Sequence, residues 1–381
     1  MKGFEEILAA VRSLAEPAAL ATLVRVRGSS YRQPGARMLF GPDGIRAGVI
    51  SAGCLETDIL ARVRQVLEGQ GARLAAYDMG NDLDLVWGTG MGCQGRADVL
   101  LERVDPGQPA AWMERSAGLL AQRRRGALAT VFTVEGETGG LRPGDHFLLE
   151  EGGPGLAPEP GPFAQSLGAA LARALATGRP EAALLRREGG ELRILAEPVL
   201  PPHALWIFGA GEHSRPIARL AKELGWFVGI VDHRPAMATR ERFPQADRIV
   251  VGHPPESLRG LPLDRRSAAL VVSHVYEKDL RALEALVPAP LAYLGLQGNR
   301  TRSRRIMQDL AGAGLALTEE QRRTLRFPAG LDIGAETPEV IALSMLAEVQ
   351  AAFAGHPGGP LRDRGGAIHQ GSGKDSQSRP G

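Results

Sequence analysis

Apolar residues near the start of the chain recur at helical spacing and then give way to strand-like runs. Phe4, Ile7, Leu8, Val11 and Leu14 follow one another every three or four residues, which predicts an amphipathic helix. The runs that follow are short, rich in β-branched residues and separated by glycine and proline turns, a pattern typical of a mixed α/β domain. They predict strands at 19–26, 37–40, 48–50, 74–77 and 97–101, and a second helix at 55–67.

The next hundred residues continue the alternation but carry no chemical motif. No internal repeat is apparent in the sequence, so we expect a single N-terminal domain at 1–200 that includes this block, 106–200, as an extension. Residues 197–202 hold three prolines and predict a stiff connector to a second domain. Within the block we expect a linker at 105–109, a helix at 112–124, and strands at 127–134, 146–150 and 182–195 with a turn at 188–190.

A buried-strand pattern at 205–208 opens a different region, in which a glycine loop, a helix and another strand follow in turn. Gly209 and Gly211 allow a tight turn and a close approach of a pyrophosphate to the helix N-terminus. Asp232 ends the next strand, where an acceptor for ribose hydroxyls is expected. Ser214 stands in place of the third glycine of this motif. That change weakens the expectation of a cofactor but leaves the expectation of a Rossmann-like fold intact.

The sequence leaves open whether this fold binds a nucleotide, because a Rossmann scaffold can also serve packing and dimerisation. Arg234 could accept a 2′-phosphate in place of a ribose hydroxyl. His274 follows a predicted strand at 268–273 and is either an acid/base group or a structural histidine. The candidate nucleotide-binding residues are Gly209, Gly211, Glu212, His213, Asp232, Arg234 and His274.

The end of the chain contains one more predicted strand, at 291–296, and a clear helix start. Thr337 suits the N-cap, Pro338 the first helical position and Glu339 the positive end of the helix dipole. Beyond residue 355 the apolar periodicity stops and glycine and proline become frequent. We therefore predict a Rossmann-like domain with a parallel sheet at 201–354, followed by a disordered tail at 355–381.

Composition narrows the classes of function. The 381 residues are 44% hydrophobic, have a formal net charge of +2 and include two cysteines. These values exclude a disulfide framework and give no basic surface for nucleic acid. No run approaches the roughly 20 apolar residues that span a bilayer, and acidic residues interrupt the N-terminal apolar positions, so neither a membrane segment nor a signal peptide is expected. A cytoplasmic protein is the simplest expectation.

Three N-terminal segments, 28–37, 51–58 and 87–96, have an unusual composition for connections. Their glycines offer backbone N–H groups to anions and their arginines add bidentate donors. Cys54 at a helix start and Cys93 near an arginine are placed to have lowered pKa values, which suits a soft metal or sulfur transfer. An inert buried thiol is the alternative for each, while zinc would need more ligands. The other candidate residues are Gly28, Ser29, Ser30, Arg37, Gly53, Glu56, Gly90, Gly92 and Arg96.

Several of these motifs resemble one known family. GSSYRQPGARM, SAGCLETD and DLVWGTGMGCQGRADVLLE are similar to segments of the XdhC/CoxI family, the accessory factors of xanthine dehydrogenase-type molybdoenzymes. FGAGEHSRP, VDHRP, SHVYEKD and GLDIGAETPEVIALS resemble the Rossmann domain of that family. The resemblance extends to about residue 353 and thins between 106 and 200. One departure is the loop after Gly298. The family has a lysine there, whereas the basic residues among 299–304 of this chain are all arginines. No role of that lysine is therefore carried over.

The resemblance implies an accessory factor more than an enzyme of metabolic turnover. Members of the family bind molybdenum cofactor, support the installation of its terminal sulfur with a cysteine desulfurase, and deliver it to the apo-enzyme. Cys54 and Cys93 would then handle sulfur or ligate molybdenum. The cofactor would be molybdopterin or its nucleotide form, NAD(P) could be a second ligand, and a homodimer is expected.

Two other functions stay open at this point. One is an NAD(P)-dependent oxidoreductase built on Gly209, Gly211 and Asp232, with His274 as acid/base, which leaves the cysteine segments without a role. The other is a non-catalytic docking or redox-sensing protein whose loops bind only a partner.

Overall fold

The computed structural model describes residues 2–28, 32–51, 53, 55–69, 71–78, 95–153, 155–157, 161–315 and 317–365. It divides the chain into two compact units, one extending to Pro201 and one running from Pro202 to Gly365. Each unit has its own sheets and its own hydrophobic clusters. Across the described ranges, no helix combines the length and apolar content that crossing a membrane requires.

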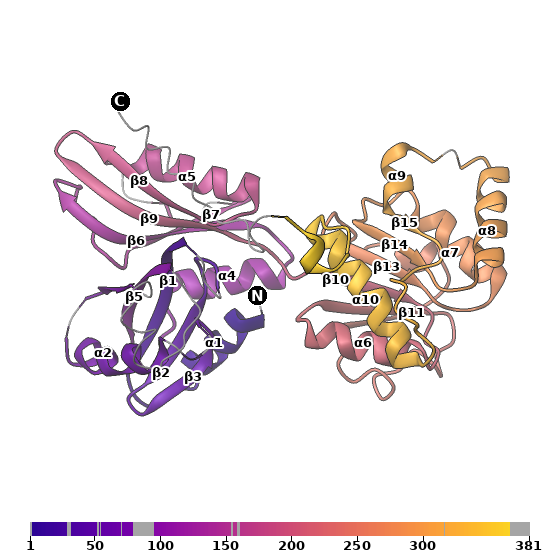
Figure 1. Cartoon of the computed structure of the whole chain (residues 1–381), viewed down its shortest axis with the longest axis horizontal. Helices are drawn as coiled ribbons and strands as arrows, with labels where there is room; N and C mark the ends of the chain where they lie inside the picture. The colour runs from indigo at the N-terminus through magenta and orange to yellow at the C-terminus, as the bar shows by residue number, and fades with distance from the viewer. Residues whose placement is uncertain are drawn as a thin grey trace. The chain divides into compact units, whose positions relative to one another are not determined.

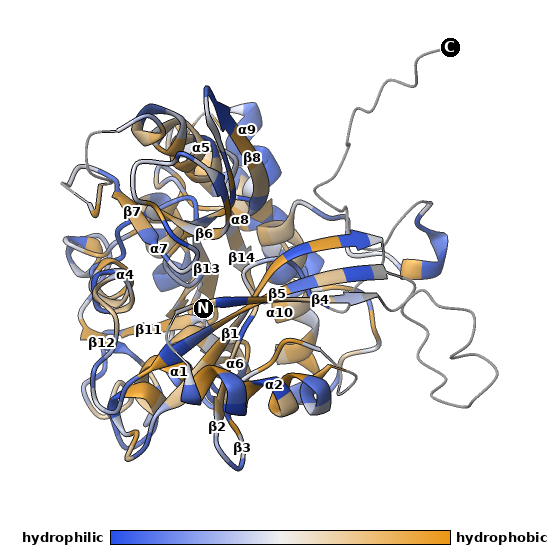
Figure 2. Ribbon diagram, turned by 90° about the vertical axis from the view of Figure 1, so that its left-hand side faces the viewer, coloured by the Kyte–Doolittle hydropathy of each residue, from blue (hydrophilic) through white to orange (hydrophobic). Residues whose placement is uncertain are grey.

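The first half of the N-terminal unit is an antiparallel sheet in the order β3-β2-β1-β5-β4. Ile59, Val63 and Val66 lie on one face of helix α2 and are buried against this sheet. Figure 2 shows β4 and β5 banded in hydrophobic and hydrophilic colours, as expected for strands that bury part of their side chains. The elements are α1 (Lys2–Arg12), β1 (Ala18–Gly28), β2 (Arg37–Gly41), β3 (Gly44–Gly48), α2 (Glu56–Glu68), β4 (Arg73–Asp78) and β5 (Gly95–Val104).

The predicted strand at 48–50 is wrong, because β3 already ends at Gly48. Gly41 pairs with Gly44 across a two-residue turn, so the strand begins directly after the turn. β3 is an edge strand whose Ile45 is 53% exposed, and it therefore lacks the apolar alternation that the prediction relied on. The buried Ile50 that suggested a strand lies beyond it.

The second half of the same unit is another antiparallel sheet, in the order β7-β6-β9-β8. Helix α5 runs along this sheet in Figure 1 and buries Leu167, Ala170 and Leu171 against it. The elements are α4 (Ala111–Ala121), β6 (Gly126–Gly136), β7 (His146–Glu150), α5 (Ala164–Thr177), β8 (Glu181–Arg187) and β9 (Gly190–Val199).

The predicted connector at 197–202 is wrong in its first half, because β9 continues through Val199. Pro198 lies in register with Ala127 of β6. Proline has a fixed φ that is compatible with extended backbone, and a strand tolerates it near its end at the loss of one N–H donor. Glu197 therefore belongs to a sheet of the N-terminal unit.

The two halves of this unit are a structural repeat, contrary to the expectation from the sequence. Both contain a helix, two strands, a second helix and two strands in the same order, with β3 added after β2 in the first half, and the neighbour order β2-β1-β5-β4 matches β7-β6-β9-β8. β1 and β6 share one burial pattern, and each has a register shift at the same place, between Leu23 and Arg25 or between Val131 and Thr133. Gly35 and Gly144 donate their N–H groups to Leu23 and Val131 respectively.

The sequence carries only faint traces of this repeat. The tetrapeptide ALAT stands at 19–22 and again at 127–130, and Pro-Gly precedes both β2 and β7 by a few residues. The halves differ most between their last two strands. A turn at 188–190 joins β8 to β9, whereas residues 79–94 stand between β4 and β5. A repeat whose loops have diverged in this way is preserved in its packing pattern rather than in residue identity.

The second unit confirms the predicted Rossmann-like domain. Its parallel sheet has the order β12-β11-β10-β13-β14-β15, in which the strand order reverses beside β10. The elements are β10 (Ala204–Phe208), α6 (Ser214–Glu223), β11 (Phe227–Asp232), β12 (Arg248–Val251), the 3-10 turn η1 (Glu256–Leu258), β13 (Ser267–Val271), α7 (Tyr276–Leu286), β14 (Tyr293–Leu296), α8 (Arg300–Gly312), α9 (Glu319–Thr324), β15 (Leu325–Arg326), α10 (Pro338–Ala354) and the 3-10 turn η2 (Leu361–Asp363).

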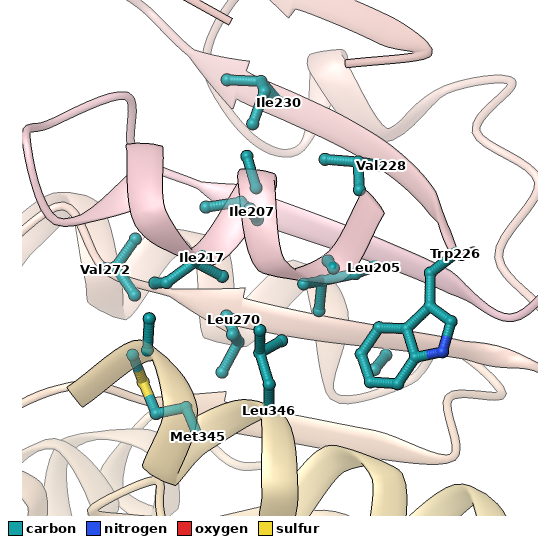
Figure 3. Close-up of a cluster of buried hydrophobic side chains, with 14 of the residues drawn as sticks. Leu205, Ile207, Ile217, Trp226, Val228, Ile230, Leu270, Val272, Met345 and Leu346 are labelled. Atoms are coloured by element: carbon teal, nitrogen blue, oxygen red, sulfur yellow. The ribbon is translucent and has the colours of Figure 1, made fainter. Parts of the chain in front are cut away.

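Helices α6 and α10 cover the same face of this sheet. Figure 3 shows Ile217 of α6 and Met345 of α10 together with Leu205 and Leu270 of the strands, all within one buried cluster. α7 and α8 contribute Leu283 and other residues to a separate cluster that contains Trp206 and Leu294. Helices therefore cover both faces of the sheet. A ligand is expected at the carboxyl ends of the strands, here called the carboxyl edge, because the loops gather there.

The helix start predicted at Thr337 is confirmed. The Thr337 side chain accepts a hydrogen bond from the Val340 N–H, and Pro338 opens α10. The predicted tail lies mostly beyond the description: residues 355–365 are described and include η2, while residues 366–381 lie outside.

Candidate functional site

Two of the three N-terminal segments include residues at the same end of the paired inner strands β1 and β5. Gly28 at the end of β1 is the register partner of Gly95 at the start of β5, and Arg27 is the partner of Arg96. Gly28 has a φ of +83°, a left-handed conformation that glycine adopts at little cost. Two arginines thus bring positive charge to the end that precedes residues 29–31 and follows residues 79–94.

Glu56 closes a compact loop at the start of α2. Its carboxylate accepts from the Ser51 hydroxyl, from the Ser51 N–H at 3.2 Å and from the Leu55 N–H at 3.1 Å. The Ser51 oxygen accepts in turn from the N–H groups of Gly53 at 3.1 Å and Leu55 at 3.2 Å. Gly53 has a φ of +110°, and a Cβ there would meet nothing within 4 Å. Glu56 therefore shapes the loop on both sides of residue 54.

Part of the predicted site falls outside the description. Within the residues described, no three histidine, cysteine or carboxylate side chains gather in a way that could hold a metal ion. The sulfur and metal roles of the two cysteines therefore stay predictions. The predicted residues that lie outside the described ranges are Ser29, Ser30, Cys54, Gly90, Gly92 and Cys93.

Arg37, the first residue of β2, is held by the second repeat. Two of its N–H groups donate to the Glu197 carboxylate, one of them at 3.1 Å, and one also donates to the Gly35 carbonyl at 3.1 Å. The guanidinium lies 5.1 Å from the centroid of the Trp112 ring. The side chains of Arg37 and Glu197 are only 8% and 12% exposed. Sequence reasoning missed Glu197 because it placed that residue in a connector.

A second pair stands at the equivalent positions with the repeats exchanged. His146 begins β7 as Arg37 begins β2, and Glu102 lies near the end of β5 as Glu197 does in β9. The two side chains meet at 2.7 Å, between His146 Nε2 and Glu102 Oε1. The Trp112 ring stacks on His146 with centroids 4.7 Å apart. The two pairs therefore join the repeats in opposite directions.

A cavity of about 150 Å³ opens beside Arg37. Its lining includes Arg32, Gly35 and Trp112, so it adjoins the first of the three predicted segments. Arg37 Nε and Ser116 Oγ are buried, belong to residues of this lining, and have no hydrogen-bond partner among the residues described. Such atoms favour a ligand or water that supplies the missing partner.

The Rossmann glycine loop has the geometry that its sequence predicts. Gly209 has a φ of +119°, and a Cβ there would lie 2.8 Å from the Ser273 nitrogen. Glycine is therefore required at this point. The fully buried Ser214 hydroxyl donates to the Gly209 carbonyl at 2.5 Å. The serine in place of the third glycine thus ties the first helical turn back to the loop.

Asp232 ends β11 where the sequence places it, but its carboxylate is already engaged. It accepts from the Ala210 N–H at 2.7 Å, from the Arg234 N–H at 2.9 Å and from the Arg234 guanidinium at 2.9 and 2.7 Å. Burial alone would raise the pKa of Asp232, yet these hydrogen bonds lower it to about 2. The expected acceptor for a ribose hydroxyl is therefore an ionised group in an ion pair.

The structure brings His213 and His274 together. Their ring centroids are 5.4 Å apart. His274 has a φ of +61°, a left-handed conformation that is uncommon outside glycine. The pKa of His274 is lowered, mainly by partial burial and to a smaller extent by the charge of the neighbouring His213. A neutral imidazole in this position can accept a proton.

The other predicted residues of this loop are engaged at its surface. The Glu212 carboxylate accepts from Arg242 at 2.6 Å and from Arg215 at 3.1 Å, and these hydrogen bonds lower its pKa. Gly211 has open space around it, so a backbone approach at this point is unobstructed.

A cavity of about 120 Å³ lies at the carboxyl edge of this sheet. Gly209, Asp232 and Ser273 line it, as do His253 and Lys278. Sequence reasoning missed His253 and Lys278, although Lys278 is one of only four lysines in the chain. A lysine is rare in this chain, and Lys278 follows a predicted strand end by a few residues. That combination is the signal that could have identified Lys278.

Comparison with known proteins decides the family. A family model described as the XdhC and CoxI family matches residues 12–78, and one described as the XdhC Rossmann domain matches residues 205–349. A Bacillus subtilis (strain 168) protein, named as a probable subunit of xanthine dehydrogenase, is 32% identical over 92% of this chain and 97% of its own length. The chain belongs to the XdhC and CoxI family. The resemblance found in the motifs is thereby confirmed.

Two further proteins are similar to this XdhC and CoxI family member along most of its length. The molybdenum cofactor insertion chaperone PaoD of Escherichia coli (strain K12) is 26% identical over 87% of this chain and 82% of its own. A crystal structure from Bacillus halodurans, described as a xanthine dehydrogenase, superposes with a TM-score of 0.74 and 28% identity, covering 93% of this chain and 96% of that one. The fold is thus shared with a solved relative over most of both chains.

Proposed function

We propose that this XdhC and CoxI family protein binds molybdenum cofactor and delivers it to a xanthine dehydrogenase-type apo-enzyme. The observation that carries this proposal is the pairing of Gly28 and Arg27 with Gly95 and Arg96, because one glycine-rich segment follows Gly28 in the chain and the other leads into Gly95. The cofactor carries a phosphate or a nucleotide, and backbone N–H groups with arginines suit such an anion. The similarity to an insertion chaperone supports the same reading.

The described residues fit such a ligand in two further ways. The loop closed by Glu56 presents Gly53 with open space around its Cα. The cavity beside Arg37 is lined by residues whose buried Nε and Oγ atoms have no partner among the described residues. When bound, the cofactor would supply the dithiolene-held molybdenum, and Gly28, Arg37, Gly53 and Arg96 would hold its anionic part.

The test is retention of molybdenum. Purified protein is mixed with cofactor, desalted and analysed for bound metal, and the loaded protein is then added to an apo-hydroxylase. We expect retention near one molybdenum per site and recovery of hydroxylase activity. If the protein retains no molybdenum and hydroxylase activity is not recovered, the proposal is refuted.

We further propose that Cys54 and Cys93 handle sulfur or ligate molybdenum while a cysteine desulfurase supplies the sulfur. Cys54 follows Gly53 inside the loop that Glu56 closes, and Cys93 lies two residues before Gly95. Cys54→Ser and Cys93→Ser should each reduce sulfuration or retention. Unchanged activation of the partner enzyme by both variants would refute the thiol role. A homodimer is part of the same proposal, and light scattering measures it directly.

The Rossmann unit supports a second function, binding of a nucleotide such as NAD(P). The favouring observation is the Gly209 loop beside a cavity at the carboxyl edge of the sheet, with His213 and His274 close by as acid/base candidates. Calorimetric titration with pyridine nucleotides tests binding, and absorbance at the reduced nicotinamide band tests hydride transfer. Binding without transfer would favour an accessory role over an oxidoreductase.

A further inference from the structure

Lys278 is a cation without a described counter-charge. It lies in the first turn of α7, at the rim of the cavity at the carboxyl edge. Its Nζ contacts both ring nitrogens of His233, at 3.4 Å from Nδ1 and closer to Nε2. Among the residues described, no carboxylate lies within ion-pair distance of it, whereas Lys222 is 2.9 Å from Asp247. A buried or half-buried cation normally has such a partner.

Two histidines, His233 and His253, adjoin Lys278, and the Nδ1 atom of His233 lies 3.2 Å from Asp232 Oδ1. The rings of His233 and His253 stack with centroids 4.7 Å apart and planes 30° from parallel. The pKa of His233 is lowered, mainly by burial and to a smaller extent by the charge of Lys278. The three side chains come from the end of β11, the loop after β12 and the start of α7, so the fold rather than a single segment brings them together.

The acids that line the same cavity do not balance Lys278. Asp232 is paired with Arg234 at 2.7 Å, and the fully buried Asp279 is paired with Arg302 at 2.6 Å. The remaining acid of the lining, Glu277, is exposed, and Arg281 belongs to the same lining. Lys278 therefore carries a positive charge that no carboxylate among the described residues pairs with, and its Nζ contacts the His233 ring.

We propose that this cavity binds the phosphomonoester group of a nucleotide, held by Lys278 together with His233 and His253. The proposal rests on nucleotide binding by the Rossmann unit and specifies the ligand that this unit prefers. A phosphomonoester is a dianion near neutral pH and accepts several hydrogen bonds, so it would pair with the charge of Lys278 and accept from Lys278 and His253, while His233 positions the ammonium.

The state of Asp232 favours the same ligand class. An unphosphorylated ribose needs a carboxylate with acceptor capacity at this place, but Asp232 already accepts four hydrogen bonds from Ala210 and Arg234. The Arg234 side chain remains 42% exposed. The edge thus presents donors toward the ribose position, which suits a phosphate on that ribose or the terminal phosphate of a mononucleotide.

Calorimetric titration of the full chain with NADP⁺, NAD⁺, 2′,5′-ADP and 5′-AMP tests the proposal. We expect NADP⁺ to bind at least about tenfold more tightly than NAD⁺, since a charge-assisted contact is gained. Preference for 2′,5′-ADP over 5′-AMP identifies a ribose phosphate, and the reverse preference identifies the terminal phosphate of a mononucleotide. Either preference supports the proposal.

The variant Lys278→Met should reduce the NADP⁺ to NAD⁺ affinity ratio to about one, while Lys278→Arg should keep most of it. Lys222→Met removes a lysine from an ion pair elsewhere in the unit and is the matched control, so it should leave the ratio unchanged. A thermal melt shows that each variant is folded. Equal binding of NAD⁺ and NADP⁺, together with equal binding of 2′,5′-ADP and 5′-AMP, overturns this inference alone. Absence of binding by all four nucleotides overturns the proposed nucleotide function as well.

Discussion

At the scale of single residues, Asp232 shows how a correct sequence prediction can still differ in chemistry. The spacing from Gly209 places an acid at the end of β11, and the structure has it there. Spacing does not reveal that Arg234, two residues later, folds back onto the carboxylate. Because that contact depends on the side-chain conformation of a single turn, no pattern of residue types predicts it.

The low pKa of Asp232 predicts a pH-dependent contribution to stability. A carboxyl group whose pKa is lower in the folded state than in the unfolded state stabilises the fold above the unfolded pKa, near 3.8, and loses this effect as the pH falls through about 2. After allowance for screening, Asp232→Asn should lower the free energy of unfolding by about 1–2 kcal/mol at pH 7. The loss should shrink below pH 4.

Urea unfolding at pH 7, 5 and 3, followed by circular dichroism, measures this difference. Glu212→Gln is the control, because Glu212 is an exposed acid whose ion pairs should contribute little to stability. If the Asp232→Asn loss is the same at pH 7 and pH 3, the ion pair with Arg234 is not its cause.

At the scale of elements, the N-cap of α10 is a local feature with a measurable effect. Thr337 accepts from the Val340 N–H, one of the helix N–H groups that lack a partner within the helix. Thr337→Ala should lower the free energy of unfolding by about 1 kcal/mol. Thr337→Ser keeps the accepting oxygen and should stay close to the unmodified protein. Thermal melts of the three proteins compare them, and equal melting temperatures would show that the cap contributes nothing.

Elements were predictable where local rules decide them. The cap at Thr337 and the turn at Gly209 depend on residues adjacent in sequence, so residue type was sufficient. The edge strand β3 was misplaced because its exposed residues carry no apolar alternation, and the end of β9 was misread because Pro198 suggested a connector. Of the candidate site, Gly209 and Asp232 lie at the turn and the strand end where the sequence predicts them, while Glu197 and Lys278 were missed because their contacts join distant segments.

At the scale of the whole N-terminal unit, the repeat explains why one half carries the candidate chemistry. In the second repeat, a turn at 188–190 takes the place of residues 79–94, so the second half has the same framework without the long segment that holds Cys93. The first repeat thus carries the proposed ligand-binding segments, and the second packs against it through two inter-repeat pairs. The Arg37–Glu197 pair is the contact through which this support reaches the first segment.

The two inter-repeat pairs allow this idea to be tested within one protein. Glu197→Gln removes the charge that neutralises the buried Arg37, which should lower the free energy of unfolding by about 3 kcal/mol. Because Arg37 also holds the Gly35 carbonyl, the same change should loosen the segment that follows Gly28 and reduce molybdenum retention severalfold. Glu102→Gln is the matched control, because it removes the carboxylate of the equivalent inter-repeat pair, whose partner is His146 and not Arg37. Retention measured well below both melting temperatures separates the effects, and equal retention by the two variants would assign Glu197 to stability alone.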